Sequence, residues 1–141
     1  MEERLFFICA KDGELNRTGQ IALLLLQAIH EGAGEKCKDI REYIVEKGYV
    51  ELTGKLTERG ERTSLPGHGN SKWTDWLNRA AASLRDKKVL QVAKACPYRT
   101  WRTTDLAEVV RRELIEELRQ MEYTDRFIFE PDFYNYVTAS I

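Results

Sequence analysis

The sequence has few of the residues that build metal sites and disulfide frameworks. Its 141 residues include three cysteines, Cys9, Cys37 and Cys96, which lie far apart and form no CxxC pair. An odd number of separated cysteines argues against a disulfide scaffold or a zinc ribbon and favours reduced thiols. The two histidines, His30 and His68, are too few for a His-rich metal centre. We therefore expect a cytoplasmic protein without a bound metal or cofactor.

Long apolar segments are also lacking. The longest apolar run, Ile21 to Leu26, has six residues, whereas a membrane span needs roughly 18. The start, MEERLFFICAKDGE, has acidic residues where a secretory signal has basic ones, so we expect no signal peptide. Apolar residues make up 43% and charged residues 32% of the chain, a composition typical of one globular domain with its own core.

The net charge of -1 conceals an uneven distribution of charge along the chain. Residues 71–102 hold eight basic and two acidic residues, a net charge of +6. Residues 1–70 have a net charge of -2, and residues 103–141 have a net charge of -5. A local positive field attracts polyanions even when the total charge of a protein is near zero. The basic block therefore favours nucleic acid as a partner.

Hydrophobic spacing predicts four helices and a β-hairpin. The expected helices cover residues 19–31, 35–47, 72–88 and 106–122. Two short extended runs, 89–93 and 100–103, flank a turn that contains Pro97, which predicts the hairpin. Asp105 and Glu108 have the spacing of a capping box at the start of the last helix, where Thr103 is the alternative cap.

This order of elements is typical of a winged helix-turn-helix domain. The expected fold class is mainly α (α+β), with a small β-hairpin wing and an extra C-terminal helix. Residues 1–18 form an arm or strand, 19–104 the winged-helix domain, and 105–141 a C-terminal helix and a tail or further strand. The apolar stripe of residues 106–121 either folds back on the core or pairs with a second copy, and we expect a homodimer.

In winged helices the third helix enters the major groove and the wing contacts the flanking backbone. The predicted buried face of the third helix consists of Trp73, Trp76, Leu77, Ala80 and Leu84. Its outward face carries Asn78, Arg79 and Arg85, side chains of the types that contact adenine and guanine edges. Asp75 and Asp86 lie on the same face and oppose phosphates. The expected contacts of helix 72–88 and wing 89–103 to the DNA backbone are Lys72, Lys88, Lys94, Arg99 and Arg102.

Three stretches carry a family resemblance: ALLLLQAIHEGAGEKCKDIREYIVE, NRAAASLRDKKVLQ and RTWRTTDLA. The matching positions are Asn78, Arg79 and Leu84 in an Asn/Arg-led helix, and Arg99, Trp101 and Thr104 at the end of a wing. Thr100 stands where the wing pattern prefers glycine. From Ile21 to Ala107 the chain resembles the N-terminal winged-helix domain of Mrr-type restriction proteins. The resemblance implies a DNA-recognition module, which in that family accompanies a separate nuclease domain.

The sequence offers no clear catalytic constellation. A restriction-type nuclease needs an acidic residue and an Asp/Glu-x-Lys strand to hold magnesium. The motif Asp86-Lys87-Lys88 falls at a helix end, so we interpret it as a charged helix terminus. No nucleophile motif accompanies His68, which lies in a glycine-flanked loop.

We therefore expect a non-enzymatic DNA-binding protein, either a transcriptional regulator or a restriction-related recognition module. The alternative is a protein–protein interaction module that reuses the winged-helix fold. In that interpretation the acidic C-terminal third is the contact surface or shields the basic block.

Overall fold

The computed structural model describes residues 17–51, 72–92, 100–124 and 127–139. The elements in chain order are α1 (Arg17–His30), α2 (Cys37–Glu46), α4 (Lys72–Asp86), β1 (Leu90–Val92), β2 (Trp101–Thr103), α5 (Leu106–Arg119) and α6 (Pro131–Ala139). Helix predominates and the two strands form a small antiparallel sheet, so the expectation of a mainly α fold with some β structure is confirmed. Within these ranges no helix has the length and apolar content that a bilayer crossing requires.

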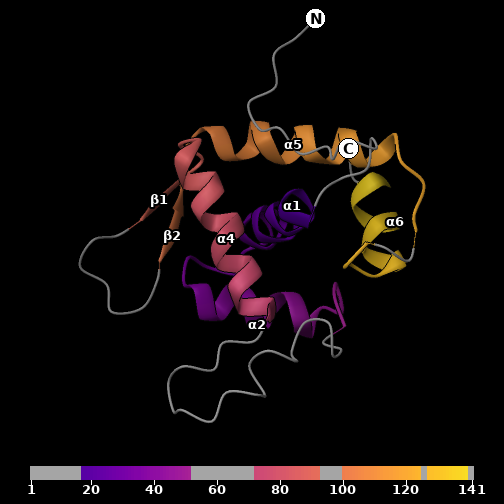
Figure 1. Ribbon diagram of the computed structural model, residues 1–141, viewed down its shortest axis with the longest axis horizontal. Helices are drawn as coiled ribbons and strands as arrows, with labels where there is room; N and C mark the ends of the chain where they lie inside the picture. Colours follow the sequence, from indigo (N-terminus) through magenta and orange to yellow (C-terminus); the bar gives the residue numbers. More distant parts are fainter. Residues whose placement is uncertain (1–16, 52–71, 93–99, 125–126, 140–141) are drawn as a thin grey trace, which may run out of the picture.

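Helix α1 forms the centre of the core. Its residues 21–28 are all buried, which requires neighbours on every side of the helix. Figure 1 shows α1 in the middle of the molecule, with α5 along the top, α4 and α2 beside it and α6 at the right. The same apolar cluster includes Ile40 and Ile44 from α2, Leu77, Ala80 and Leu84 from α4, and Val110 and Leu114 from α5. Each fully buried leucine contributes roughly 1.5–3 kcal/mol, so α1 supplies much of the driving force for folding.

The two strands pair directly after α4. The register places Leu90 opposite Thr103, Gln91 opposite Arg102 and Val92 opposite Trp101. Leu90 and Trp101 are buried, whereas Gln91 and Arg102 are exposed. The two predicted strands are thus confirmed over residues 90–92 and 101–103. The predicted turn between them, residues 94–99, lies outside the described residues.

The segment between α1 and α2 extends this sheet. Lys36 forms an isolated antiparallel bridge with Thr100. The Trp101 N–H donates a hydrogen bond to the Glu35 carbonyl at 2.6 Å. Because Trp101 is also buried, this contact fixes the hairpin against the helices.

Helix α5 directs its apolar face at the protein's own core. Val110, Leu114, Ile115 and Leu118 are fully buried, and α5 packs against α1 and α6. Val109, with 46% of its surface exposed, is the large apolar side chain of α5 that faces outward. The stripe therefore gives no evidence for the homodimer through residues 106–121, which stays an untested prediction.

The start of α5 differs from the predicted capping box. Asp105 occupies the N-cap position, but its side chain makes no capping hydrogen bond. The Thr104 hydroxyl instead accepts a hydrogen bond from the Leu106 N–H at 3.3 Å. Glu108 accepts hydrogen bonds from Arg111 and Arg112 in the next helical turn. The capping box was wrong because these guanidinium groups bind Glu108 in place of the N-cap N–H.

The C-terminal segment is a helix, where the sequence predicted a strand or a tail. Helix α6 begins at Pro131, a residue favoured in the first turn because it has no N–H to leave unpaired. Phe133 and Val137, four residues apart, are its buried face. Among the described residues of this segment, strand character is limited to an isolated bridge between Phe129 and Val50. Weak helix formers such as Tyr, Asn and Thr obscured this short helix in the sequence.

Candidate nucleic-acid interface

The outward face of α4 carries two exposed arginines. Arg79 is exposed, and no ion pair joins it to another described residue. Arg85 has 53% of its side chain exposed and lies 3.8 Å from its neighbour Asp86. An ion pair this exposed contributes about 0–1 kcal/mol, so the Arg85 guanidinium is available to a partner.

Asn78 does not present the group that base recognition needs. Its Oδ1 atom is buried and has no hydrogen-bond partner among the described residues. A bidentate contact to adenine uses both the oxygen and the nitrogen of the amide. Ala81, one turn further on, is also buried, so the buried face of α4 is wider on this side than the sequence pattern predicted. The burial of this oxygen does not favour the predicted contact of Asn78 with adenine, which stays a prediction.

A further cation from α1 lies against α4. The Arg17 guanidinium is 4.0 Å from the ring centroid of Trp76, a cation–π geometry. Trp76 is half-buried and packs on the core, as its position in the helical pattern predicted. Arg79 follows Trp76 by one helical turn and therefore lies near it on the helix surface. No sequence pattern linked Arg17 to this face, because the contact is made by tertiary packing.

The end of α4 and the hairpin add more positive charge. Lys87 and Lys88 are exposed immediately after α4. Arg102 is exposed on β2 and forms an ion pair with Glu35 at 3.6 Å. Of the other predicted backbone contacts, the side chain of Lys72 and the whole of Lys94 and Arg99 lie outside the described residues.

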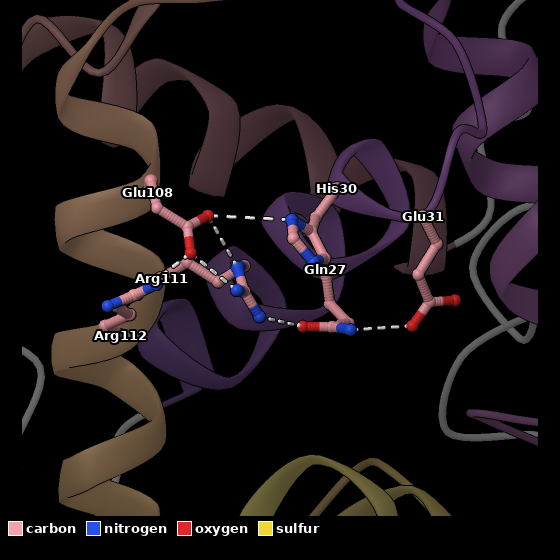
Figure 2. A network of polar contacts seen from close by, with 6 residues as sticks. All are labelled: Gln27, His30, Glu31, Glu108, Arg111 and Arg112. Carbon is pink, nitrogen blue, oxygen red and sulfur yellow. Dashed lines mark hydrogen bonds and ion pairs between the residues drawn. The ribbon is translucent and has the colours of Figure 1, made fainter. Parts of the chain in front are cut away.

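A second polar cluster, shown in Figure 2, joins α1 to α5. Arg111, only 5% exposed, donates hydrogen bonds to Gln27 at 2.7 Å and to Glu108 at 2.7 and 3.1 Å. Glu108 also accepts from Arg112 at 3.0 Å, and His30 Nδ1 lies 3.6 Å from it. Hydrogen bonds from Arg111 and Arg112 outweigh burial and hold the pKa of Glu108 at about 2. This carboxylate is therefore charged at neutral pH and holds Arg111, whose hydrogen bond to Gln27 joins α5 to α1.

The cluster continues to a carboxylate surrounded by tyrosines. Glu31 accepts hydrogen bonds from Tyr49 at 2.6 Å, Tyr43 at 2.7 Å, Gln27 at 2.7 Å and Tyr136 at 3.0 Å. Burial alone would raise the pKa of Glu31, but these donors lower it overall. Burial and the neighbouring carboxylate raise the pKa of Tyr43 to about 12. Glu31 thus ties α1 to α2, to the chain after it and to α6.

A cavity of about 420 Å³ adjoins this cluster between α1 and the start of α5. Its lining includes His30, Thr104, Glu108 and Arg111. Glu108 and Arg111 are already paired with each other, so these two charges of the lining stabilise the fold. The exposed cations of α4 and the hairpin are therefore the better candidate for binding a partner.

Comparisons with protein-family models, with curated protein sequences and with solved structures found no match for this chain. The resemblance to the Mrr-type domain thus rests on the sequence stretches quoted above.

Proposed function

We propose that the protein is a winged helix-turn-helix domain that binds double-stranded DNA, with α4 in the major groove and the hairpin on the DNA backbone. The order of elements supports this proposal, because in the described part of the chain α1, α2 and α4 precede two paired antiparallel strands. The bridge between Lys36 and Thr100 joins the hairpin to the segment before α2. Strand β1 also packs against α4, so α4 and the hairpin can meet a duplex together.

The observation that carries the proposal is the pair of exposed arginines on α4. Arginine donates two parallel hydrogen bonds to the O6 and N7 atoms of guanine, a contact that contributes roughly 1–3 kcal/mol of discrimination. Arg79 and Arg85 are six residues apart, which is about 9 Å along the helix axis. That spacing corresponds to roughly two to three base pairs of B-DNA. The pair therefore suits a short site with two guanines.

The backbone contacts would come from Lys88 at the end of α4 and Arg102 on β2. The sequence predicts three further contacts to the DNA backbone, from Lys72, Lys94 and Arg99. Five contacts to phosphates give an expected slope of about -4.5 in a plot of log affinity against log salt concentration. A slope this steep separates DNA binding from association with a neutral surface.

The test is binding of the purified chain to a labelled random-sequence duplex, titrated from low to physiological salt. The double variant Arg79→Glu/Arg85→Glu should lose binding throughout the titration. Arg79→Glu alone should weaken binding at least tenfold, because it replaces a guanine donor with a charge that repels DNA. The control Arg112→Glu makes the same charge change on α5, outside the proposed face, and should bind like the wild type.

Two results would overturn the proposal. Absence of wild-type binding at low salt would leave the chain without the polyanion affinity that the basic block predicts. Equal losses in Arg79→Glu and Arg112→Glu would show that net charge matters and the α4 face does not. Either result would favour the protein–protein interaction module as the function.

A further inference from the structure

Lys88 has an unusual backbone conformation at the junction of α4 and β1. Its φ is +64°, and no other described residue except glycine has a positive φ. In this left-handed region the Cβ of an L-residue crowds the following carbonyl, so a lysine here costs free energy that a glycine would not.

Three helices of this protein end in the same way, and only one of them uses lysine. At each end the residue with positive φ donates its N–H to a carbonyl three residues back, and the next N–H reaches five residues back. The donor–acceptor pairs are Gly32–Ile29 and Ala33–Ala28 after α1, Gly48–Val45 and Tyr49–Ile44 after α2, and Lys88–Arg85 and Val89–Leu84 after α4. Glycine, the residue that most often adopts positive φ at a helix end, occupies this position after α1 and after α2. Because glycine would end α4 with less strain, the lysine at this position is not explained by helix termination alone.

A second set of contacts fixes the backbone of Lys88. The Thr104 hydroxyl donates a hydrogen bond to the Lys88 carbonyl at 2.6 Å, with the Val89 carbonyl also within reach at 3.2 Å. The Thr104 N–H donates to the Val89 carbonyl at 2.9 Å. Thr104, two residues before α5, therefore holds the strained turn in place.

The side chain of Lys88 remains exposed, and no ion pair joins it to another described residue. It lies between the two elements proposed to contact DNA, next to Lys87 and three residues after Arg85. Because the backbone is already fixed, binding through Lys88 loses less conformational entropy than binding through a lysine on a loose loop. Strained residues held by their surroundings are typical of functional positions.

We propose that Lys88 is a preset contact to a DNA phosphate and that Thr104 is its positioning residue. This inference rests on the proposed function, and it adds which lysine is fixed before binding and what fixes it. Lys88→Gly relieves the strained turn and removes the charge, so stability and DNA binding should change in opposite directions. If Lys88 had only a structural role, Lys88→Gly would change the stability of the protein and leave DNA binding unchanged.

The experiment measures thermal unfolding and salt-dependent duplex binding for the wild type and three variants. Lys88→Gly should raise Tm by about 2–6 °C and reduce the magnitude of the log–log salt slope by about 0.9. Lys88→Arg, which keeps the charge, should retain the wild-type slope. Lys87→Ala removes the neighbouring charge, whose backbone does not have the positive φ of Lys88. It should change the salt slope by less than half of the change that Lys88→Gly causes.

Thr104→Ser tests the positioning role, because serine keeps the hydroxyl. It should bind DNA like the wild type, whereas Thr104→Val should bind several-fold more weakly with an unchanged slope. If Lys88→Gly binds as tightly as the wild type with the same slope, or lowers Tm, the inference is overturned while the proposed function stands. If the wild type itself fails to bind the duplex, the proposed function fails and this inference fails with it.

Discussion

The hydrogen bonds that connect Glu108, Arg111 and Gln27 at the contact of α5 with α1 lead to a specific prediction for Glu108→Ala. Arg111 has 6% of its side chain exposed and relies on Glu108 for two of its hydrogen bonds. Removing the carboxylate leaves a guanidinium that is nearly buried with only Gln27 as a described partner. The variant therefore isolates the cost of an uncompensated buried charge.

The size of the effect follows from the burial of the two partners. Breaking a fully buried ion pair by removing one partner costs about 3–5 kcal/mol, whereas an exposed pair contributes about 0–1 kcal/mol. Arg111 belongs to the first class, but the Glu108 side chain is 43% exposed, so water reaches one side of the pair. We expect Glu108→Ala to lower the free energy of unfolding by about 2–3 kcal/mol, between these limits.

Urea denaturation followed by circular dichroism measures this loss as a lower midpoint with an unchanged m-value. Arg112→Ala is the matched control, because Arg112 also binds Glu108 but has 64% of its side chain exposed. It should cost less than about 1 kcal/mol. A cost for Glu108→Ala no greater than that for Arg112→Ala would show that the burial of Arg111 does not set the loss of stability.

Three further predictions concern ionisation, the tyrosine cluster and the hairpin. Arg111 lowers the pKa of Glu108 from 4.5 to about 2, so the stability that Glu108 provides is present above pH 4.5 and is lost as the pH falls towards 2. Urea titrations across this range should show the loss, and Glu108→Gln should flatten it; an equally steep loss in the variant would contradict the assignment. Tyr49→Phe removes the 2.6 Å hydrogen bond to Glu31 and should cost about 1–2 kcal/mol in the same assay, whereas no cost would mean that the hydroxyl stabilises nothing. Glu35→Gln removes the acid that pairs with Arg102 and should strengthen duplex binding a few-fold, measured by fluorescence anisotropy; weaker binding would show that Glu35 is needed to position Arg102.

The helices with a clear apolar period could be predicted from the sequence alone. The run from Ile21 to Ala28 predicted a helix buried on most sides, and every one of these residues is buried. Helices at Cys37–Glu46, Lys72–Asp86 and Leu106–Arg119 fall within the predicted ranges, with ends that are one to three residues shorter. Helix α6 was missed because its buried residues, Phe133 and Val137, are too few to establish a period.

The candidate interface could be predicted only in part. The charge distribution located the basic block, and Arg79, Arg85 and Arg102 are exposed as expected. The burial of the Asn78 oxygen depends on how α4 packs against its neighbours, which a helical pattern does not specify. The contact of Arg17 with Trp76 joins residues 59 positions apart, and no local signal reports it.

The sequence did not predict the hydrogen-bond network of Glu31, Gln27, Glu108 and Arg111, because it also depends on tertiary packing. Gln27 and Arg111 are 84 positions apart in the chain. A sequence pattern assigns polar residues to the solvent, yet both side chains are buried and paired with each other. The one sign of this burial in the sequence was the position of Arg111, which follows Val110 inside an apolar stripe.

The most direct test of the central claim is an NMR titration of the labelled protein with a short DNA duplex. The amide signals of residues 76–88 and 100–103 should shift in proportion to bound DNA, because these residues form the proposed interface. The amide signals of residues 132–139 in α6 should stay in place. Shifts confined to α6 and the acidic C-terminal third, or no shifts at low salt, would contradict DNA binding through α4.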